Sequence, residues 1–65
     1  MQKYQERVVA ERDELLDKFT KLAKFVYSER ALSLSSMEKE RMQKQLYIML
    51  EYIKILTERI SAFKK

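Results

Sequence analysis

Seven apolar residues in the second half of this chain follow an unbroken alternation of four- and three-residue steps, the spacing of a helix with one buried stripe. They are Met42, Leu46, Met49, Ile53, Leu56, Ile60 and Phe63. The first half has a similar stripe with one charged member: Val8, Arg12, Leu15, Phe19, Leu22 and Val26. The chain contains no glycine and no proline, the two residue types that most strongly interrupt helices. The pattern predicts an all-α chain with two amphipathic helices.

A serine-rich segment separates the two stripes. Residues 28–36 lack helical spacing and hold four serines, whose hydroxyls favour turns and helix caps. Ser35 and Glu38 have the spacing of a capping box, in which the hydroxyl accepts from the Glu38 amide and the carboxylate reaches back. We therefore expect an antiparallel two-helix hairpin with helices over about 3–28 and 36–63. Leu32 and Leu34 are expected to plug its closed end.

The length of the chain limits its core. Sixty-five residues make one domain, 1–65, and a chain of this size buries only roughly 60% of the surface that its unfolded form exposes. Small scaffolds usually gain stability from disulfides, a metal or a partner chain. Cysteine and histidine are absent, which excludes disulfides and Cys/His metal sites. We expect no metal and no cofactor, and self-association is the remaining route.

The second helix carries more apolar surface than one neighbour covers. Beside the main stripe, Ile48, Tyr52 and Ile55 form a second row, which Leu50 widens. A helix that is apolar over most of its circumference is buried by several neighbours. We therefore expect a homo-oligomeric helical bundle, a dimer or higher, with Ile48, Leu50 and Ile55 at the interface between copies.

Polar residues interrupt the second row at regular intervals. Gln45, Tyr52 and Arg59 lie seven residues, or about two turns, apart. One interpretation is structural, since buried polar residues fix the register of coiled coils. The other is ligand binding, since an amide, a phenol and a guanidinium suit a nucleobase and a phosphate. The residues alone leave both interpretations open.

Two arginines of the first helix also allow either a structural or a ligand-binding role. Folding the hairpin near residue 32 brings Arg12 to the level of Tyr52, and Arg7 to the level of Arg59. Arg12 either covers apolar surface beside an acidic partner or meets an anion. Gathered arginines require acidic neighbours, such as Glu11 and Glu58, or a bound anion. The candidate ligand-binding residues are Arg7, Arg12, Gln45, Tyr52 and Arg59.

Charge and hydropathy narrow the function further. The net charge of +4 mildly favours an anionic partner, and Lys64 and Lys65 suit the negative end of a helix dipole. No apolar stretch approaches the about 20 residues that cross a bilayer, so we expect a cytosolic protein without a membrane partner. The first-helix carboxylates have no paired base, and there is no Gly-rich phosphate loop. We expect no enzyme.

Several segments resemble a family of small helical-hairpin proteins of phages and prophages related to a crAss-like phage protein. They are Tyr4-Gln5-Glu6-Arg7-Val8, Glu14-Leu15, Leu22-Ala23-Lys24-Phe25 and the spaced set Gln45, Leu46, Met49, Tyr52, Leu56, Arg59 and Ile60. Residues 33–36 depart from the family, whose members more often have an acidic loop there. The resemblance implies a phage accessory protein made in the cytoplasm of the infected bacterial host.

Similar phage hairpins assemble into oligomers and act as sponges that hold cyclic nucleotide signals of bacterial antiviral systems between protomers. By extension, the resemblance suggests an anti-defence sponge without catalysis. Two alternatives stay open: a Rop-like helical bundle that binds nucleic acid, and an inhibitor or adaptor that presents a helical face to a host protein. The balanced charge of the first helix argues against nucleic-acid binding, because no continuous basic stripe emerges there.

Overall fold

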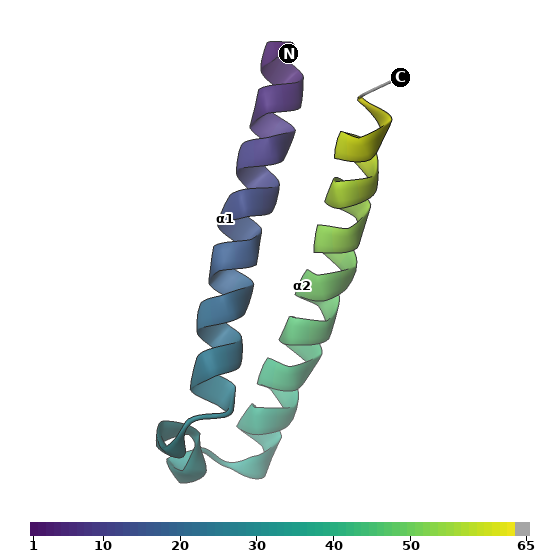
Figure 1. The fold of residues 1–65 in the computed structure, drawn as a ribbon. Helices are drawn as coiled ribbons and strands as arrows, with labels where there is room; N and C mark the ends of the chain where they lie inside the picture. The colour runs from purple at the N-terminus through teal and green to yellow at the C-terminus, as the bar shows by residue number, and fades with distance from the viewer. Residues whose placement is uncertain (64–65) are drawn as a thin grey trace.

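The computed structural model describes residues 1–63, which form a hairpin of two long helices (Figure 1). Helix α1 spans Lys3–Val26, a short 3₁₀ helix η1 spans Glu29–Ser33, and helix α2 spans Ser36–Ala62. No β-strand occurs within these 63 residues. The predicted all-helical fold, with two helices packed against each other, is confirmed, and both helices end within two residues of their expected limits. Lys64 and Lys65 lie outside the described residues.

Local hydrogen bonds explain where α2 and α1 begin. The Ser35 hydroxyl accepts from the Glu38 amide at 3.1 Å, as the capping spacing predicts. The Glu38 carboxylate does not complete the box, because it accepts instead from Arg41 Nε at 2.8 Å. At the start of α1, the Gln2 amide donates to Gln5 Oε1 at 2.9 Å. At the start of each helix, one side-chain oxygen therefore accepts a hydrogen bond from a backbone N–H group that has no partner within the helix.

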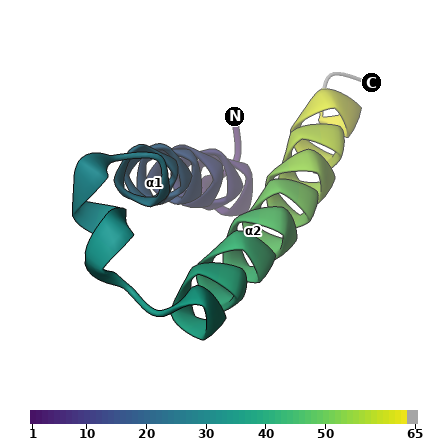
Figure 2. The same ribbon diagram turned by 90° about the horizontal axis from the view of Figure 1, so that it is seen from below.

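The two stripes pack against each other and form the core. Val8 of α1 is buried with Leu46, Ile53 and Leu56 of α2, and Leu56 is the most completely enclosed. The other stripe residues are half-buried. At the open end, the rings of Tyr4 and Phe63 meet edge-to-face with 5.9 Å between centroids. Seen from below, α2 runs obliquely to α1 (Figure 2), as expected when side-chain ridges of one helix fit the grooves of another.

The closed end differs from the sequence-based expectation. Ala31 is the buried residue of η1, whereas Leu32 is 74% exposed and Leu34 is half-buried. The prediction that Leu32 plugs this end is therefore wrong. A 3₁₀ helix has three residues per turn, so neighbouring side chains point about 120° apart, and only one of them faces the hairpin. The Ser28 and Ser33 hydroxyls donate to the carbonyls of Phe25 and Arg30, at 2.6 and 3.0 Å.

Candidate functional site

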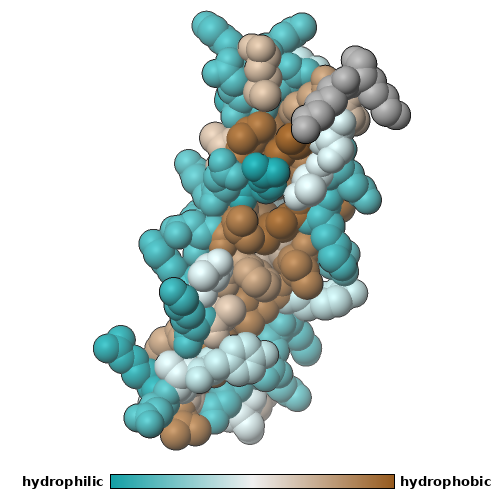
Figure 3. Space-filling model, viewed as in Figure 1, coloured by the Kyte–Doolittle hydropathy of each residue, from teal (hydrophilic) through white to brown (hydrophobic). Residues whose placement is uncertain are grey.

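The second apolar row of α2 is exposed in the hairpin. Ile48 is 66% exposed, Ile55 54% and Tyr52 42%, whereas the main stripe of the same helix is buried or half-buried. Figure 3 shows hydrophobic side chains forming a band along the line between the two helices, with hydrophilic side chains on either side. Because α1 alone packs on α2, it covers one stripe and leaves the other open. Apolar side chains grouped in this way mark interaction surfaces.

The three residues expected at an interface between copies do not share one face. Each residue of an α-helix turns about 100° around the axis. Ile48 and Ile55, seven residues apart, therefore point in nearly the same direction, whereas Leu50 points about 200° away from Ile48. Leu50 is also exposed. Ile48 and Ile55 belong to the same row as Tyr52, and Leu50 lies on the opposite side of α2.

Tyr52 connects this row to α1. Its hydroxyl donates a hydrogen bond to the Glu11 carboxylate, across 41 positions of sequence. Glu11 flanks the buried stripe of α1, three residues after Val8, so it lies at the edge of the helix interface. This contact joins the two helices at the level of Glu11 and Tyr52. It also fixes the phenol at the border between the covered and uncovered sides of α2.

The electrostatics of Tyr52 place Arg59 near the same point. The hydrogen bond to Glu11 raises the pKa of Tyr52 above its usual value of 10.0, and desolvation and the Glu11 charge act in the same direction. The positive charge of Arg59 opposes this and lowers the pKa. Tyr52 therefore stays a neutral hydroxyl donor near pH 7. Glu11, Tyr52 and Arg59 form one cluster, which we call the Tyr52 cluster.

Arg12 does not join the Tyr52 cluster through its polar atoms. Its guanidinium donates to Asp13 Oδ1 from Nε and Nη2, at 3.2 and 3.1 Å. The Arg12 side chain is half-buried in the α1 stripe, so the structure matches the structural interpretation: an apolar stem with an acidic partner. Arg7 and Arg12 are five positions apart and point about 140° away from each other. The two arginines therefore lie on different edges of α1.

Arg7 and Gln45 are both exposed. Arg7 borders an open hollow of about 450 Å³ on α1, together with Lys3, Glu6 and Ala10. Within residues 1–63, the ion pairs involve neither Arg7 nor Arg59. Arg7 and Arg59 are both exposed in this part of the chain.

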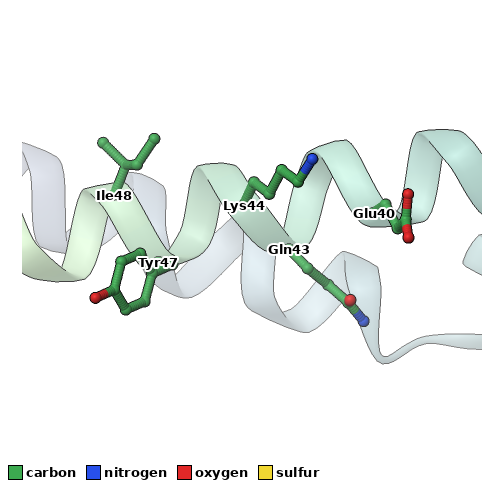
Figure 4. A pocket seen from close by; sticks show the side chains of 5 residues that line it. All are labelled: Glu40, Gln43, Lys44, Tyr47 and Ile48. Carbon is green, nitrogen blue, oxygen red and sulfur yellow. The ribbon is translucent and has the colours of Figure 1, made fainter.

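A second hollow, which sequence reasoning missed, lies on the outer side of α2. It measures about 530 Å³ and is lined by Glu40, Gln43, Lys44, Tyr47 and Ile48. In Figure 4, Tyr47 and Gln43 project to one side of the helix, and Ile48 and Lys44 to the other. The five lining residues recur at steps of three and four, so they border one broad strip of the helix surface over about two turns. This spacing was the feature of the sequence from which the hollow could have been predicted. All the walls come from one helix, so a molecule in this hollow is contacted from one side only.

Two further properties of residues 1–63 bear on function. This part of the chain has no group of three acidic side chains that could hold a metal ion. Neither of its helices combines the length and the apolarity needed to cross a membrane.

Comparison with known proteins gives two matches and one negative result. An uncharacterized 7.5 kDa protein from the denB–rIIB intergenic region of Enterobacteria phage T4 is 39% identical over 61 residues, which cover 94% of this chain and 95% of the phage protein. No solved structure matches the chain. The T4 relative supports the predicted relation to small phage proteins, while the link to a crAss-like phage stays a prediction. A model of the Sequestin family matches residues 2–62, and the chain therefore belongs to the Sequestin family.

Proposed function

We propose that this protein is a phage-encoded sponge that binds and sequesters a cyclic nucleotide or cyclic oligonucleotide immune signal at an oligomer interface, without catalysis, in the cytoplasm of the infected bacterial host. The observation that carries the proposal is the exposed row of α2, where Tyr52 and Arg59 stand among exposed isoleucines. The name of the Sequestin family and the phage T4 relative support a sequestering role in a phage.

The chemistry of the row fits an anion that carries an aromatic base. The Arg59 guanidinium offers a planar fork of donors to phosphate oxygens, and the Tyr52 ring offers a surface for stacking. Gln45, two turns before Tyr52, offers an amide for the hydrogen-bonding edge of a base. Sequestration requires affinity and no bond making, so the absence of histidine and cysteine from the chain is no obstacle to it.

Enclosure of the ligand requires more than one copy of the chain. Each hollow described above is lined by a single helix, and Ile48 and Ile55 of the exposed row stay open to solvent although Tyr52 contacts Glu11 of α1. Small-molecule sites bury most of their ligand. A homo-oligomer that covers the row supplies the missing wall and at the same time removes the isoleucines from water.

The proposal is tested by native mass spectrometry of freshly purified protein, followed by melting curves with a panel of cyclic di- and trinucleotides. The expected result is an oligomer that binds one of these compounds stoichiometrically, melts at a higher temperature in its presence and releases it intact after denaturation. No melting shift with any member of the panel would contradict nucleotide sequestration. Binding of structured RNA with a steep salt dependence, or stoichiometric capture of one host protein, would support the alternative functions instead.

A further inference from the structure

The exposed row of α2 has a nearly palindromic order around Tyr52. Gln45 and Arg59 lie seven positions on either side, and Ile48 and Ile55 lie four and three positions away. We propose that this row packs against the same row of a second copy that runs antiparallel, with the two Tyr52 side chains at the centre. This inference rests on the proposed function and deepens it, because it names the surface that closes the site.

In the antiparallel register, apolar residues face apolar residues and polar residues face polar residues. Centred on Tyr52, it places Ile48 opposite the partner's Ile55, and Gln45 opposite the partner's Arg59. The isoleucines, 66% and 54% exposed in one hairpin, then cover each other. The Gln45 carbonyl is a suitable acceptor for the guanidinium of the partner's Arg59. Polar residues within an apolar seam specify one register against its alternatives.

Charge favours the antiparallel over the parallel arrangement of the two α2 helices. A parallel arrangement in register would place Arg59, which lies on the midline of the row, opposite the partner's Arg59, and this pair repels. The antiparallel arrangement instead brings Lys44 within about two residues of the level of the partner's Glu58, on the same flank of the interface. Only Glu51, at the middle of that flank, then approaches its own copy. Its charge is already balanced by Lys54 at 3.7 Å.

The contact with α1 leaves room for this second neighbour. The Tyr52 hydroxyl is held by Glu11 at the edge of the hairpin, while Ile48 and Ile55 point further away from α1. Helix α2 can therefore pack on α1 with one stripe and on the partner's α2 with the other. The site of each copy is incomplete alone, since Gln45 from one copy and Arg59 from the other lie on each side of the central tyrosines.

Cysteine cross-linking tests the register, because the chain has no cysteine of its own. An equimolar mixture of Ile48→Cys and Ile55→Cys, oxidised without nucleotide, should give the mixed disulfide, since these positions differ by only one residue, or about 1.5 Å, in level. Ile48→Cys alone should not cross-link, since its two copies lie roughly 12 Å apart along the axis, beyond the about 7 Å limit between Cα atoms of a disulfide. Leu50→Cys, on the opposite side of α2, is the matched control and should also stay reduced.

A measurement on the unmodified chain guards against variants that fail to fold. A zero-length carbodiimide should join Lys44 to Glu58 of a second copy. The same two residues within one helix lie about 21 Å apart and cannot react with each other. Recovery of this cross-linked peptide from the dimer band, and from that band only, is the expected result.

The contrary outcomes are distinct from a failure of the proposed function. Self-cross-linking of Ile48→Cys, or cross-linking through Leu50→Cys, overturns the antiparallel Tyr52-centred interface while leaving an oligomer that can still bind nucleotide. A chain that stays monomeric in native mass spectrometry also overturns this interface. In either case, the separate melting curves with cyclic nucleotides decide whether ligand binding survives.

Discussion

Helices α1 and α2 are similar in length but differ in what they leave exposed. The exposed side of α1 is charged, with local pairs such as Asp17 and Lys21 at 3.0 Å, and Leu16 stands there among polar residues. The exposed side of α2 carries Tyr47, Ile48, Tyr52 and Ile55 within nine residues. The hairpin therefore covers the apolar stripe of α1, whereas it covers only one of the two apolar rows of α2. The difference supports the proposal that assembly and ligand binding use the exposed row of α2.

The largest effect is expected from damage to the covered stripe of α2. Leu56→Ala removes a fully buried side chain and should destabilise the fold by about 2–5 kcal/mol, which is a large share of the stability of so small a chain. Circular dichroism melting curves check this. Thr57→Ala, next to Leu56 but exposed, is the control and should melt close to the unmodified protein. An equal loss in both variants would mean that the stripe is not the core.

A substitution in the exposed row of α2 should weaken self-association and leave the fold itself largely intact. Ile55→Asp places a charge on the exposed row and should weaken self-association about a hundredfold, or roughly 2.7 kcal/mol, while leaving the helix content at high protein concentration little changed. Analytical ultracentrifugation measures the dissociation constant. Leu16→Asp makes the same change at an exposed leucine of α1. If Leu16→Asp dissociates the oligomer as strongly as Ile55→Asp, the contrast between the helices fails.

The polar members of the row should affect the ligand more than the assembly. Arg59→Ala removes a charge-assisted contact to phosphate and should lower nucleotide affinity about tenfold, or roughly 1.4 kcal/mol. Isothermal titration with the nucleotide identified by the melting panel checks this. Arg30→Ala, in η1 at the far end of the hairpin, loses the same charge and should bind normally. Equal losses from the two variants would indicate a general charge effect and no site at Arg59.

The smallest effect is expected at the contact between the helices. Tyr52→Phe removes the hydrogen bond to Glu11 and should lower the melting temperature much less than Leu56→Ala. Because folding raises the pKa of Tyr52 above 10.0, the stabilisation by the neutral phenol is fully present below pH 10 and is lost as pH rises through the folded-state pKa.

The difference in melting temperature between Tyr52→Phe and the unmodified chain should therefore be constant from pH 7 to about pH 9 and should shrink above pH 10. Melting curves across this range provide the measurement. A difference that grows with increasing alkalinity would contradict the contact with Glu11.

Sequence reasoning predicted part of the candidate site and missed part of it. Tyr52 and Arg59 were identified by their spacing, and the structure places them in one cluster. Glu11 was expected only as a neutralising neighbour, whereas it accepts the Tyr52 hydrogen bond. Arg12 was grouped with Arg7 by its level along the hairpin. That grouping ignored direction, since level and angle around the helix are independent quantities.

Consecutive residues are enough to specify the two helices, their ends and the stripes of residues that face each other. These features depend on the helical repeat of 3.6 residues and on local capping, both of which are written in consecutive residues. The tertiary structure decided that Glu11 meets Tyr52, that Arg12 turns to Asp13, and that Ala31 rather than Leu32 closes the turn. The Arg12 and Leu32 outcomes follow local geometry that apolar spacing does not specify, namely the neighbouring Asp13 and the 3₁₀ turn. The contact between Glu11 and Tyr52 depends on how far one helix slides and rotates against the other. A regular apolar repeat does not specify this sliding and rotation, because neighbouring registers of the two helices bury nearly the same apolar surface.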